Sequence, residues 1–340
     1  MANEYSPLRW GILGCGSIAN RFADDVSALP DHVIHAAGSR DKAKSEVFLA
    51  KYGGGAAYGS YDELVTDLEV DTVYVATPHP FHKKHALLAL HAGKPVLCEK
   101  PFTVNAAEAA EVVAEARLRG IFVMEGMWSR CFPVMRKVRE LVESGAIGKP
   151  RMIEADFGFQ AGETTEAGVL SVGNPNGRLF DLKLAGGALM DVGVYVVSLA
   201  QMFFGEPDKV AAVATLGTTG VDENTGIVLG FPGGGIGVLS TSLQATTPFK
   251  ATILGSAGKI EIHSPWWTAS SFMVHRKGKD AETITEPFTG GGFQFEAMHV
   301  ADCLRAGKTE SDLITLDETL AIMRTLDRVR AEIGLKYPME

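Results

Sequence analysis

Residues 8–19 read Leu-Arg-Trp-Gly-Ile-Leu-Gly-Cys-Gly-Ser-Ile-Ala, and this stretch decides the fold of the first part of the chain. The apolar run from Leu8 to Leu13 predicts a buried strand, and Ser17 to Leu29 has the periodicity of a helix. The turn and the first helical residues are Gly14, Cys15, Gly16, Ser17, Ile18 and Ala19, which follow the pattern G-x-G-x-x-A. We therefore expect a strand, a tight glycine turn and a helix in direct succession.

This turn has the residues that a bound dinucleotide would require. Gly14 permits a tight turn, Gly16 lets the backbone approach a pyrophosphate, and Ala19 allows the helix to pack closely on the strand. The helix N-terminus would add N–H groups and positive partial charge. The pattern predicts a dinucleotide-binding unit, and a tight turn without a ligand is the alternative.

The two parts of the chain differ in their secondary-structure pattern. Up to about residue 125, apolar runs alternate with helical segments, which is typical of a parallel sheet. From residue 151 onward strand-like segments dominate, with helices expected at 188–204, 295–306 and 316–333. We expect an α/β Rossmann domain over residues 1–125 and an α+β domain with a large, mostly antiparallel open sheet over residues 126–340.

Composition excludes several classes of protein. There are 41 acidic and 32 basic side chains, a net charge of −9, which argues against nucleic acid as a partner. No run of 18 apolar residues predicts a membrane span, and the N-terminus lacks the pattern of a secretory signal. The 4 cysteines have no zinc-site or disulfide-framework spacing, so we expect buried thiols, a cytoplasmic location and no metal.

The end of the second predicted strand bears on the choice of cofactor. NAD-binding units usually carry an acidic residue here for the ribose 2′-hydroxyl, whereas this chain has Ser39 and Arg40, with Lys44 nearby. A guanidinium suits a 2′-phosphate, so the sequence favours NADP over NAD. The alternative is that these basic residues form the solvated start of a helix, and Asp41 is close enough to compete for the ribose.

Further polar residues follow the later parallel strands. Glu99 and Lys100 end a buried strand, where ligands of open parallel sheets bind. A lysine in such a place can hydrogen-bond a substrate hydroxyl and ease its deprotonation, although a surface charge is the alternative. Residues following the preceding strand are expected to line the ribose and nicotinamide, namely Thr77, Pro78, His79 and His82, although the histidines could be cap and turn residues.

Asp191 and Tyr195 lie one helical turn apart in Gly-Gly-Ala-Leu-Met-Asp-Val-Gly-Val-Tyr, residues 186–195. A phenol beside a carboxylate and a lysine is a plausible proton-transfer group, and an ordinary amphipathic helix is the alternative. Trp128 and Arg130 follow the last predicted parallel strand. They could bind a polyol or a ring, or could pack.

The motifs GCGSIA, EKP and GGALMDVGVY, in this order, resemble the glucose–fructose oxidoreductase/inositol dehydrogenase/MocA family. The segments GSRD, EKPF, EGMWSRCFP and RLFDLKLAGGALMDVGVY look most like its branch of dimeric dihydrodiol dehydrogenases and NADP-dependent D-xylose dehydrogenases. The resemblance implies that Lys100 is the catalytic lysine, Tyr195 the acid/base and Asp191 a substrate-orienting carboxylate. It also implies a substrate site that includes Trp128, Arg130, Phe157 and Arg178, and a homodimer or homotetramer formed through the second domain's sheet.

These observations lead to a functional hypothesis. We expect an NADP-dependent dehydrogenase or reductase that acts on the CH–OH group of a sugar, polyol or cyclic vicinal diol. Two alternatives remain at this point, a non-catalytic NADP-sensing regulator and an NAD-dependent glycosidase of the same fold.

Overall fold

The computed structural model describes residues 6–164, 170–171 and 177–340. The chain divides into two compact units, of which the first comprises Met1–Cys131 and Thr289–Thr319. The second comprises Phe132–Phe288 and Leu320–Glu340. The sequence places a boundary near residue 125 but gives no sign that residues 289–319 return to the first unit.

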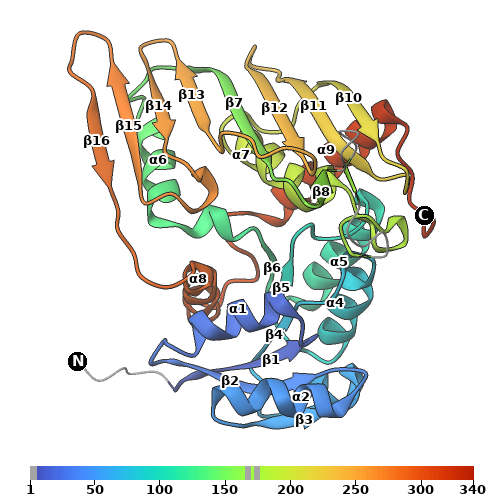
Figure 1. Cartoon of the computed structure of the whole chain (residues 1–340). Coiled ribbons are helices and arrows are strands. Elements are labelled where there is room, and N and C mark those ends of the chain that lie inside the picture. Colours follow the sequence, from blue (N-terminus) through green and yellow to red (C-terminus); the bar gives the residue numbers. More distant parts are fainter. Residues whose placement is uncertain (1–5, 165–169, 172–176) are drawn as a thin grey trace. The chain divides into compact units, whose positions relative to one another are not determined.

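The first unit contains a six-stranded sheet in the order β3-β2-β1-β4-β5-β6, with every neighbouring pair parallel (Figure 1). Its strands are β1 (Leu8–Leu13), β2 (His32–Gly38), β3 (Ala56–Tyr58), β4 (Thr72–Val75), β5 (Val96–Glu99) and β6 (Val123–Gly126). Its helices are α1 (Ser17–Val26), α2 (Lys42–Leu49), α3 (Tyr61–Val65), α4 (His82–His91), α5 (Ala106–Arg119) and α8 (Phe293–Arg305). The predicted parallel α/β unit is confirmed.

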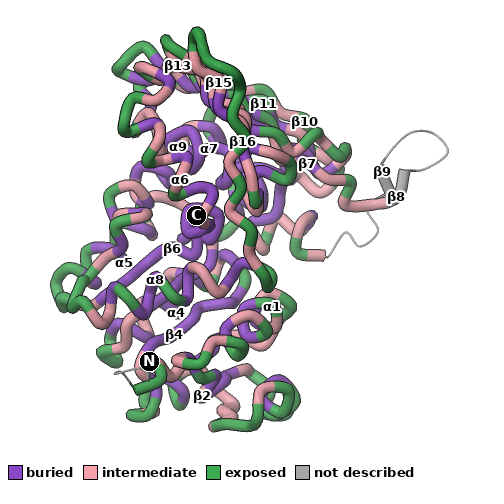
Figure 2. Tube along the Cα trace, turned by 90° about the vertical axis from the view of Figure 1, so that its left-hand side faces the viewer, coloured by how far each residue is buried: buried purple, intermediate pink, exposed green. Residues whose placement is uncertain are grey.

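The order of the strands indicates where a ligand would bind on this sheet. β1 pairs with β2 on one side and with β4 on the other, so the order of the strands reverses between β1 and β4. In such sheets, ligands bind at the carboxyl ends of the strands beside this switch point. β4 and β6 are buried along their whole length (Figure 2), as expected of strands covered on both faces.

Aromatic packing explains why α8 belongs to the first unit. Phe22 of α1 stacks on Tyr74 of β4 with ring centroids 3.9 Å apart. It also meets Phe293 of α8 edge to face at 6.4 Å, and Phe293 is fully buried. The first turn of α8 therefore completes a core that residues 8–75 begin.

The second unit is built on an eight-stranded sheet in the order β10-β11-β12-β7-β13-β14-β15-β16. Only the pair of β12 and β7 is parallel, so the predicted mostly antiparallel sheet is confirmed. Its strands are β7 (Pro150–Gly158), β10 (Lys209–Leu216), β11 (Asp222–Gly230), β12 (Ile236–Ser242), β13 (Ala251–Gly255), β14 (Gly258–Ile262), β15 (Ser271–Arg276) and β16 (Glu282–Thr285). A separate short pair consists of β8 (Glu163–Thr164) and β9 (Leu170–Ser171).

The central helix of the second unit is α7 (Val194–Phe204), preceded by a π-helical turn over Leu189–Gly193. The sequence predicts one continuous helix over 188–204. The stretch Leu182–Phe204 is long and apolar enough to cross a membrane, but 83% of its most apolar window is buried inside the structure. Its burial (Figure 2) is that of a core helix. The remaining helices are α6 (Pro133–Glu143) and α9 (Leu316–Ile333).

Candidate active site

The turn after β1 has the conformation that its glycines predict. Gly14 has φ +99°, and a Cβ atom there would lie 3.0 Å from the carbonyl oxygen of Ala76 after β4. Both facts restrict the position to glycine. A Cβ at Gly16 would meet nothing within 4 Å, so the space above this residue is open to a ligand.

The start of α1 fits a pyrophosphate. Gly16 is the N-cap residue and forms no side-chain cap, so no side chain of this residue competes for the first N–H groups of α1. Ser17 is exposed and Ile18 half-buried at this end, whereas Ala19 is fully buried against the sheet. This arrangement is suited to the phosphates of a dinucleotide.

Arg40 lines a cavity of about 380 Å³ beside the ends of β2 and β4. Thr77 and Pro78 also line it, and the remaining lining residues are Gly59, Ser60, Tyr61, Asp62, Phe81, Lys84 and His85. Burial lowers the pKa of His85 to about 4, so its imidazole is neutral at physiological pH. Aromatic rings and a guanidinium around one cavity suit a nucleoside that carries a phosphate. Tyr61 and His85 were missed because they belong to different helices, α3 and α4, which only the fold brings together.

Asp41 is the nearest acidic residue to the end of β2, and its carboxylate is hydrogen-bonded to the backbone. It is the N-cap of α2, and its Oδ1 accepts a hydrogen bond from the N–H of Ala43 at 3.1 Å. Ser39 Oγ accepts a longer one, 3.4 Å, from the N–H of Asp41. Lys44 and Cys15 line a separate depression of about 280 Å³ and not the Arg40 cavity.

Lys100 follows β5 and is half-buried. Its N–H donates to the Glu99 carboxylate at 3.1 Å, and the hydroxyl of Tyr74 donates to the other oxygen of that carboxylate. The peptide bond from Lys100 to Pro101 is cis. The backbone of the lysine is thus held at the carboxyl end of the sheet, on the strand next to β4.

His82 is fully buried, and both of its ring nitrogens meet backbone carbonyl oxygens. Nδ1 lies 2.9 Å from the oxygen of Pro101, and Nε2 lies 2.6 Å from that of Thr77. The ring of His79 packs against it, with centroids 5.7 Å apart, and His79 is also buried. These contacts favour the turn-forming alternative for His82 over a role in lining the cofactor.

In the second unit, the glycine-rich motif is held by Asp222. This buried carboxylate accepts hydrogen bonds from Leu189 N–H at 2.8 Å and from Thr225 Oγ1 at 2.7 Å. A Cβ at Gly187, where φ is +117°, would lie 2.1 Å from Asp222 Oδ1. Burial raises the pKa of Asp222 to about 6. Asp222 therefore fixes the start of the π-helical turn, an irregularity that is frequent at functional sites.

The π-helical turn carries Asp191, which forms an ion pair with Arg178 at 2.7 Å. The Asp191 side chain is 9% exposed and that of Arg178 is 46% exposed. Tyr195 begins the next turn, is 6% exposed, and has its ring centroid 5.4 Å from that of Phe157 on β7. Four of the residues predicted for substrate and catalysis therefore lie in one part of the second unit.

Two aromatic residues that the sequence analysis missed extend this group. Trp267 stacks on Phe157 with centroids 3.5 Å apart, and Phe249 meets both rings edge to face. All three rings are half-buried. We call Phe157, Phe249 and Trp267 the aromatic wall. No local signal identifies it, because its members lie on or beside strands that pair only in the folded sheet.

Trp128 and Arg130 are packed within the first unit. Trp128 stacks on Phe293 at 4.4 Å. The side chain of Arg130 is 2% exposed and forms an ion pair with Glu318 at 3.3 Å. Such burial favours the packing alternative over substrate binding for Arg130.

Comparison with known proteins agrees with this geometry. The model of the oxidoreductase family with an NAD-binding Rossmann fold matches residues 8–127. The model of the Gfo/Idh/MocA C-terminal domain matches residues 135–261. The chain belongs to the Gfo/Idh/MocA oxidoreductase family. The predicted resemblance is confirmed, and the chain is a dehydrogenase or reductase of this family.

Known proteins that resemble this chain match nearly all of its length. It is 39% identical over 345 residues to trans-1,2-dihydrobenzene-1,2-diol dehydrogenase of Mus musculus, covering 98% of this chain and 99% of that protein. The Homo sapiens protein of the same name is 37% identical over 344 residues, with the same coverage. A solved 3-ketoreductase from Actinomadura kijaniata, in complex with NADP and TDP-benzene, is 27% identical, with a TM-score of 0.82 and coverage of 96% and 98%. An aldose-aldose oxidoreductase from Caulobacter crescentus is 25% identical, with a TM-score of 0.81; this alignment covers 96% of this chain and 98% of that chain.

Proposed function

We propose that the chain is an NADP-dependent oxidoreductase that transfers hydride between nicotinamide and a sugar, polyol or cyclic vicinal diol. The observation that carries the substrate class is the grouping of Tyr195, the Asp191–Arg178 ion pair and the aromatic wall within the second unit. Charged groups can bind neighbouring hydroxyls, and aromatic rings can pack on the flat face of a ring substrate. The names of the relatives, which include diol and aldose oxidoreductases, support the same class.

The residues have distinct roles in the proposed oxidation. Tyr195 accepts the proton of the hydroxyl group at the reacting carbon, as a general base. To Lys100 we assign the stabilisation, by its positive charge, of the developing alkoxide and of the deprotonated phenol. Asp191, held by Arg178, binds a second hydroxyl and orients the substrate. The bound nicotinamide cofactor supplies the hydride acceptor.

Two observations support NADP as that cofactor. Arg40 lines the cavity at the end of β2, where its guanidinium can pair with a 2′-phosphate. The Asp41 carboxylate, which would compete by binding a ribose 2′-hydroxyl, caps α2 instead. An NADP complex is also known for the 3-ketoreductase described above.

Steady-state kinetics of two variants test the assignment. Lys100→Ala and Tyr195→Phe should each lower turnover by about 10²–10⁴-fold, the usual size of a lost acid–base contribution, while NADPH still binds. Tyr58→Phe is a matched control, because its hydroxyl donates to Asp67 and has no part in the proposed reaction. Turnover near that of the unmodified chain in either variant, with NADPH bound, would refute the roles given to these residues.

Products identify the reaction class. When the chain is incubated with NADP and a panel of diols and aldoses, at least one of them should give net formation of NADPH, which is measured by nicotinamide absorbance. Glycoside cleavage without net reduction would point to a glycosidase, and NADPH binding without turnover on any substrate would point to a regulator. Either result would overturn the proposal.

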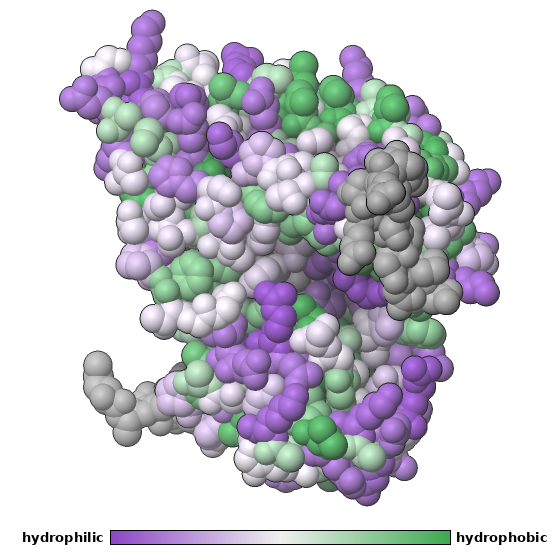
Figure 3. Space-filling view, in the orientation of Figure 1, coloured by the Kyte–Doolittle hydropathy of each residue, from purple (hydrophilic) through white to green (hydrophobic). Residues whose placement is uncertain are grey.

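We also propose a homodimer or homotetramer formed through the sheet of the second unit. Apolar side chains gather over β10, β11 and β12 (Figure 3), and those exposed there are Val213, Leu216, Val228, Ile236 and Val238. Val228 and Val238 are direct cross-strand partners, so they form one continuous apolar surface. Val228→Glu should shift the mass measured by light scattering to that of a monomer; an unchanged oligomer would contradict this interface, as would a monomeric unmodified chain.

A cytoplasmic location completes the proposal. None of the 4 cysteines, all in described parts of the chain, forms a disulfide, which is typical of a reducing compartment. Cell fractionation tests it, and recovery of the protein outside the cytoplasm would contradict it.

A further inference from the structure

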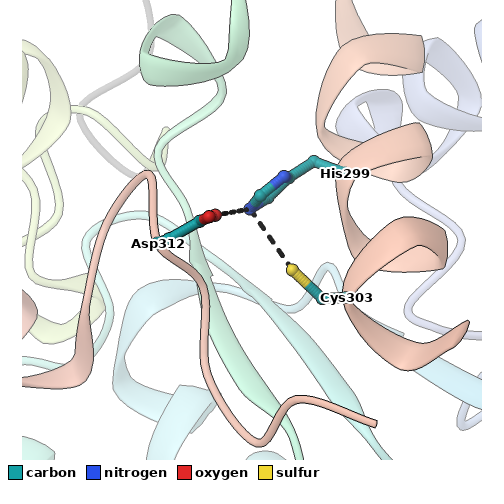
Figure 4. A group of neighbouring side chains, drawn as sticks. All are labelled: His299, Cys303 and Asp312. Atoms are coloured by element: carbon teal, nitrogen blue, oxygen red, sulfur yellow. Dashed lines mark hydrogen bonds and ion pairs between the residues drawn. The ribbon is translucent and has the colours of Figure 1, made fainter. Parts of the chain in front are cut away.

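A cluster of three metal-binding side chains lies in the first unit, apart from the residues assigned to the reaction. His299 and Cys303 project from successive turns of α8 toward Asp312, which lies on the loop after that helix (Figure 4). The spacing of four residues places the imidazole and the thiol on the same face of α8. The candidate ligand atoms of the three residues all lie within 4.8 Å of one another.

The two distances from His299 are close to the edges of a tetrahedral zinc site. His299 Nε2 is 3.5 Å from Cys303 Sγ and 3.5 Å from Asp312 Oδ1. Zinc bonds of about 2.0 Å to nitrogen and about 2.3 Å to sulfur, at the tetrahedral angle, place those two atoms roughly 3.5 Å apart. The imidazole thus already lies at close to the distances from the thiol and from the carboxylate that a zinc ion would impose, and the thiol and the carboxylate lie within 4.8 Å of each other.

Nε2 of His299 is the atom on which the polar groups of this cluster converge. Nε2 of His299 also lies 2.8 Å from Ser311 Oγ, so a single ring nitrogen has three polar neighbours. A neutral imidazole nitrogen has only one N–H or one lone pair to offer. An ion bound by the imidazole, the thiolate and the carboxylate would contact all three ligand groups and would take the lone pair of Nε2 in place of the hydrogen bond with Ser311.

We propose that His299, Cys303 and Asp312 bind a zinc ion. A nitrogen, a sulfur and an oxygen ligand form a donor set typical of Zn²⁺, whereas Mg²⁺ and Ca²⁺ prefer oxygen ligands only. His299 and Cys303 are buried, while the Asp312 side chain is 65% exposed, so water can reach the fourth position. Lys308 pairs with Asp312 Oδ2 at 3.0 Å, and the other oxygen, Oδ1, faces His299. No metal is expected from the sequence, because neither the cysteines nor the histidines and acidic residues have a standard metal-ligand spacing.

The ion would have a structural role in the first unit. It would join α8 to the loop at 306–315, which forms a bridge to β6 between Val123 and Glu310. The carboxylate of Glu310 in turn accepts from the N–H of Leu316, where α9 begins. A zinc link at Asp312 would therefore fix the segment that returns the chain from α8 to α9.

Titration of the full chain with Zn²⁺ and with Co²⁺ tests the site. After treatment with chelator and dialysis, the chain should bind one equivalent of Zn²⁺ by calorimetry, and its midpoint of thermal unfolding should rise. Co²⁺ should give a sulfur-to-metal charge-transfer band and the intense visible bands of a tetrahedral centre. Asp312→Asn should weaken Zn²⁺ binding by about 10-fold or more, and Cys303→Ala by about 100-fold or more with loss of the sulfur band. The control is Asp302→Asn, which removes an exposed carboxylate from the same helix and should leave binding unchanged.

Each outcome decides the proposal. Absence of Zn²⁺ binding by the unmodified chain, or a Co²⁺ spectrum without the sulfur band, would overturn it. Equal binding by the unmodified chain and Asp312→Asn would overturn it as well. The Co²⁺ spectrum of the unmodified chain and the exposed Asp312 variant keep the test valid if Cys303→Ala does not fold.

Discussion

Arg178 and Asp191 form an ion pair of 2.7 Å that joins the segment before the glycine-rich motif to the π-helical turn within it. Asp191 is nearly buried, so the guanidinium neutralises a carboxylate that would otherwise be poorly solvated. Arg178 remains about half-exposed and keeps donors available for a ligand. One side of the pair therefore positions the other, and both are expected to contact substrate hydroxyls.

Removing the guanidinium should weaken substrate use. Arg178→Ala should lower kcat/KM by about 10–100-fold, because a hydrogen bond to a charged group contributes about 1.5–3 kcal/mol. Steady-state kinetics with a diol or aldose measures the change. Lys183→Ala removes an exposed cation from the same segment and should have little effect; equal losses in the two variants would show a general effect of charge.

Cofactor preference should depend on Arg40. Arg40→Ala should weaken NADPH binding by about 10–100-fold and leave NADH binding within a few-fold, since only NADPH carries the 2′-phosphate. Fluorescence titration with both nucleotides measures this. Lys42→Ala is the control for general positive charge, because this exposed residue does not line the Arg40 cavity. Equal effects of Arg40→Ala on the two nucleotides would contradict the NADP assignment.

The buried carboxyl of Glu125 should make the free energy of unfolding decrease as pH rises. This fully buried carboxyl accepts from Phe102 N–H at 3.2 Å and from Thr319 Oγ1 at 3.1 Å, and burial raises its pKa to about 7. The folded chain holds this proton more tightly than the unfolded chain, so protonated Glu125 stabilises the folded state. This contribution to the free energy of unfolding is complete below about pH 4.5 and is lost as pH rises to about 7.

Glu125→Gln should remove this contribution to the pH dependence. The decrease in the free energy of unfolding between those pH values should become smaller by up to about 3 kcal/mol. Urea unfolding at several pH values measures it, with Glu332→Gln as an exposed control. The same slope in Glu125→Gln and in the unmodified chain would contradict the buried-carboxyl explanation.

Gly187 should tolerate no side chain. Gly187→Ala would place a Cβ against the Asp222 carboxylate at a φ of +117° and should cost about 2–4 kcal/mol of unfolding free energy. Gly120 also has a positive φ, +61°, in the left-handed helical region, but a Cβ there would meet nothing within 4 Å. Gly120→Ala should therefore cost only about 1–2 kcal/mol. Denaturant unfolding of both variants separates the steric contact from the backbone preference, and equal costs would argue against the contact.

The amino-acid sequence alone was enough to predict the parallel unit and its phosphate-binding turn. Those predictions rest on local preferences: the apolar run of β1, the left-handed backbone of Gly14 and the small Ala19 need only near neighbours to take effect. The same holds for Lys100, which is located by the end of a strand and the proline after it. The positions of Asp191 and Tyr195 on one helical segment also followed from their spacing.

Only the tertiary structure decided which surfaces meet. Residues 289–319 belong to the first unit because Phe293 packs against the ring of Phe22. The amphipathic pattern of α8 does not specify that partner. The π-helical turn arises because Asp222, on a strand of the sheet, bonds the N–H of Leu189. The aromatic wall likewise forms only when the strand of Phe157 is packed beside Trp267. The conformational preference of the backbone is set by adjacent residues, whereas packing and hydrogen bonding between distant residues depend on the whole fold.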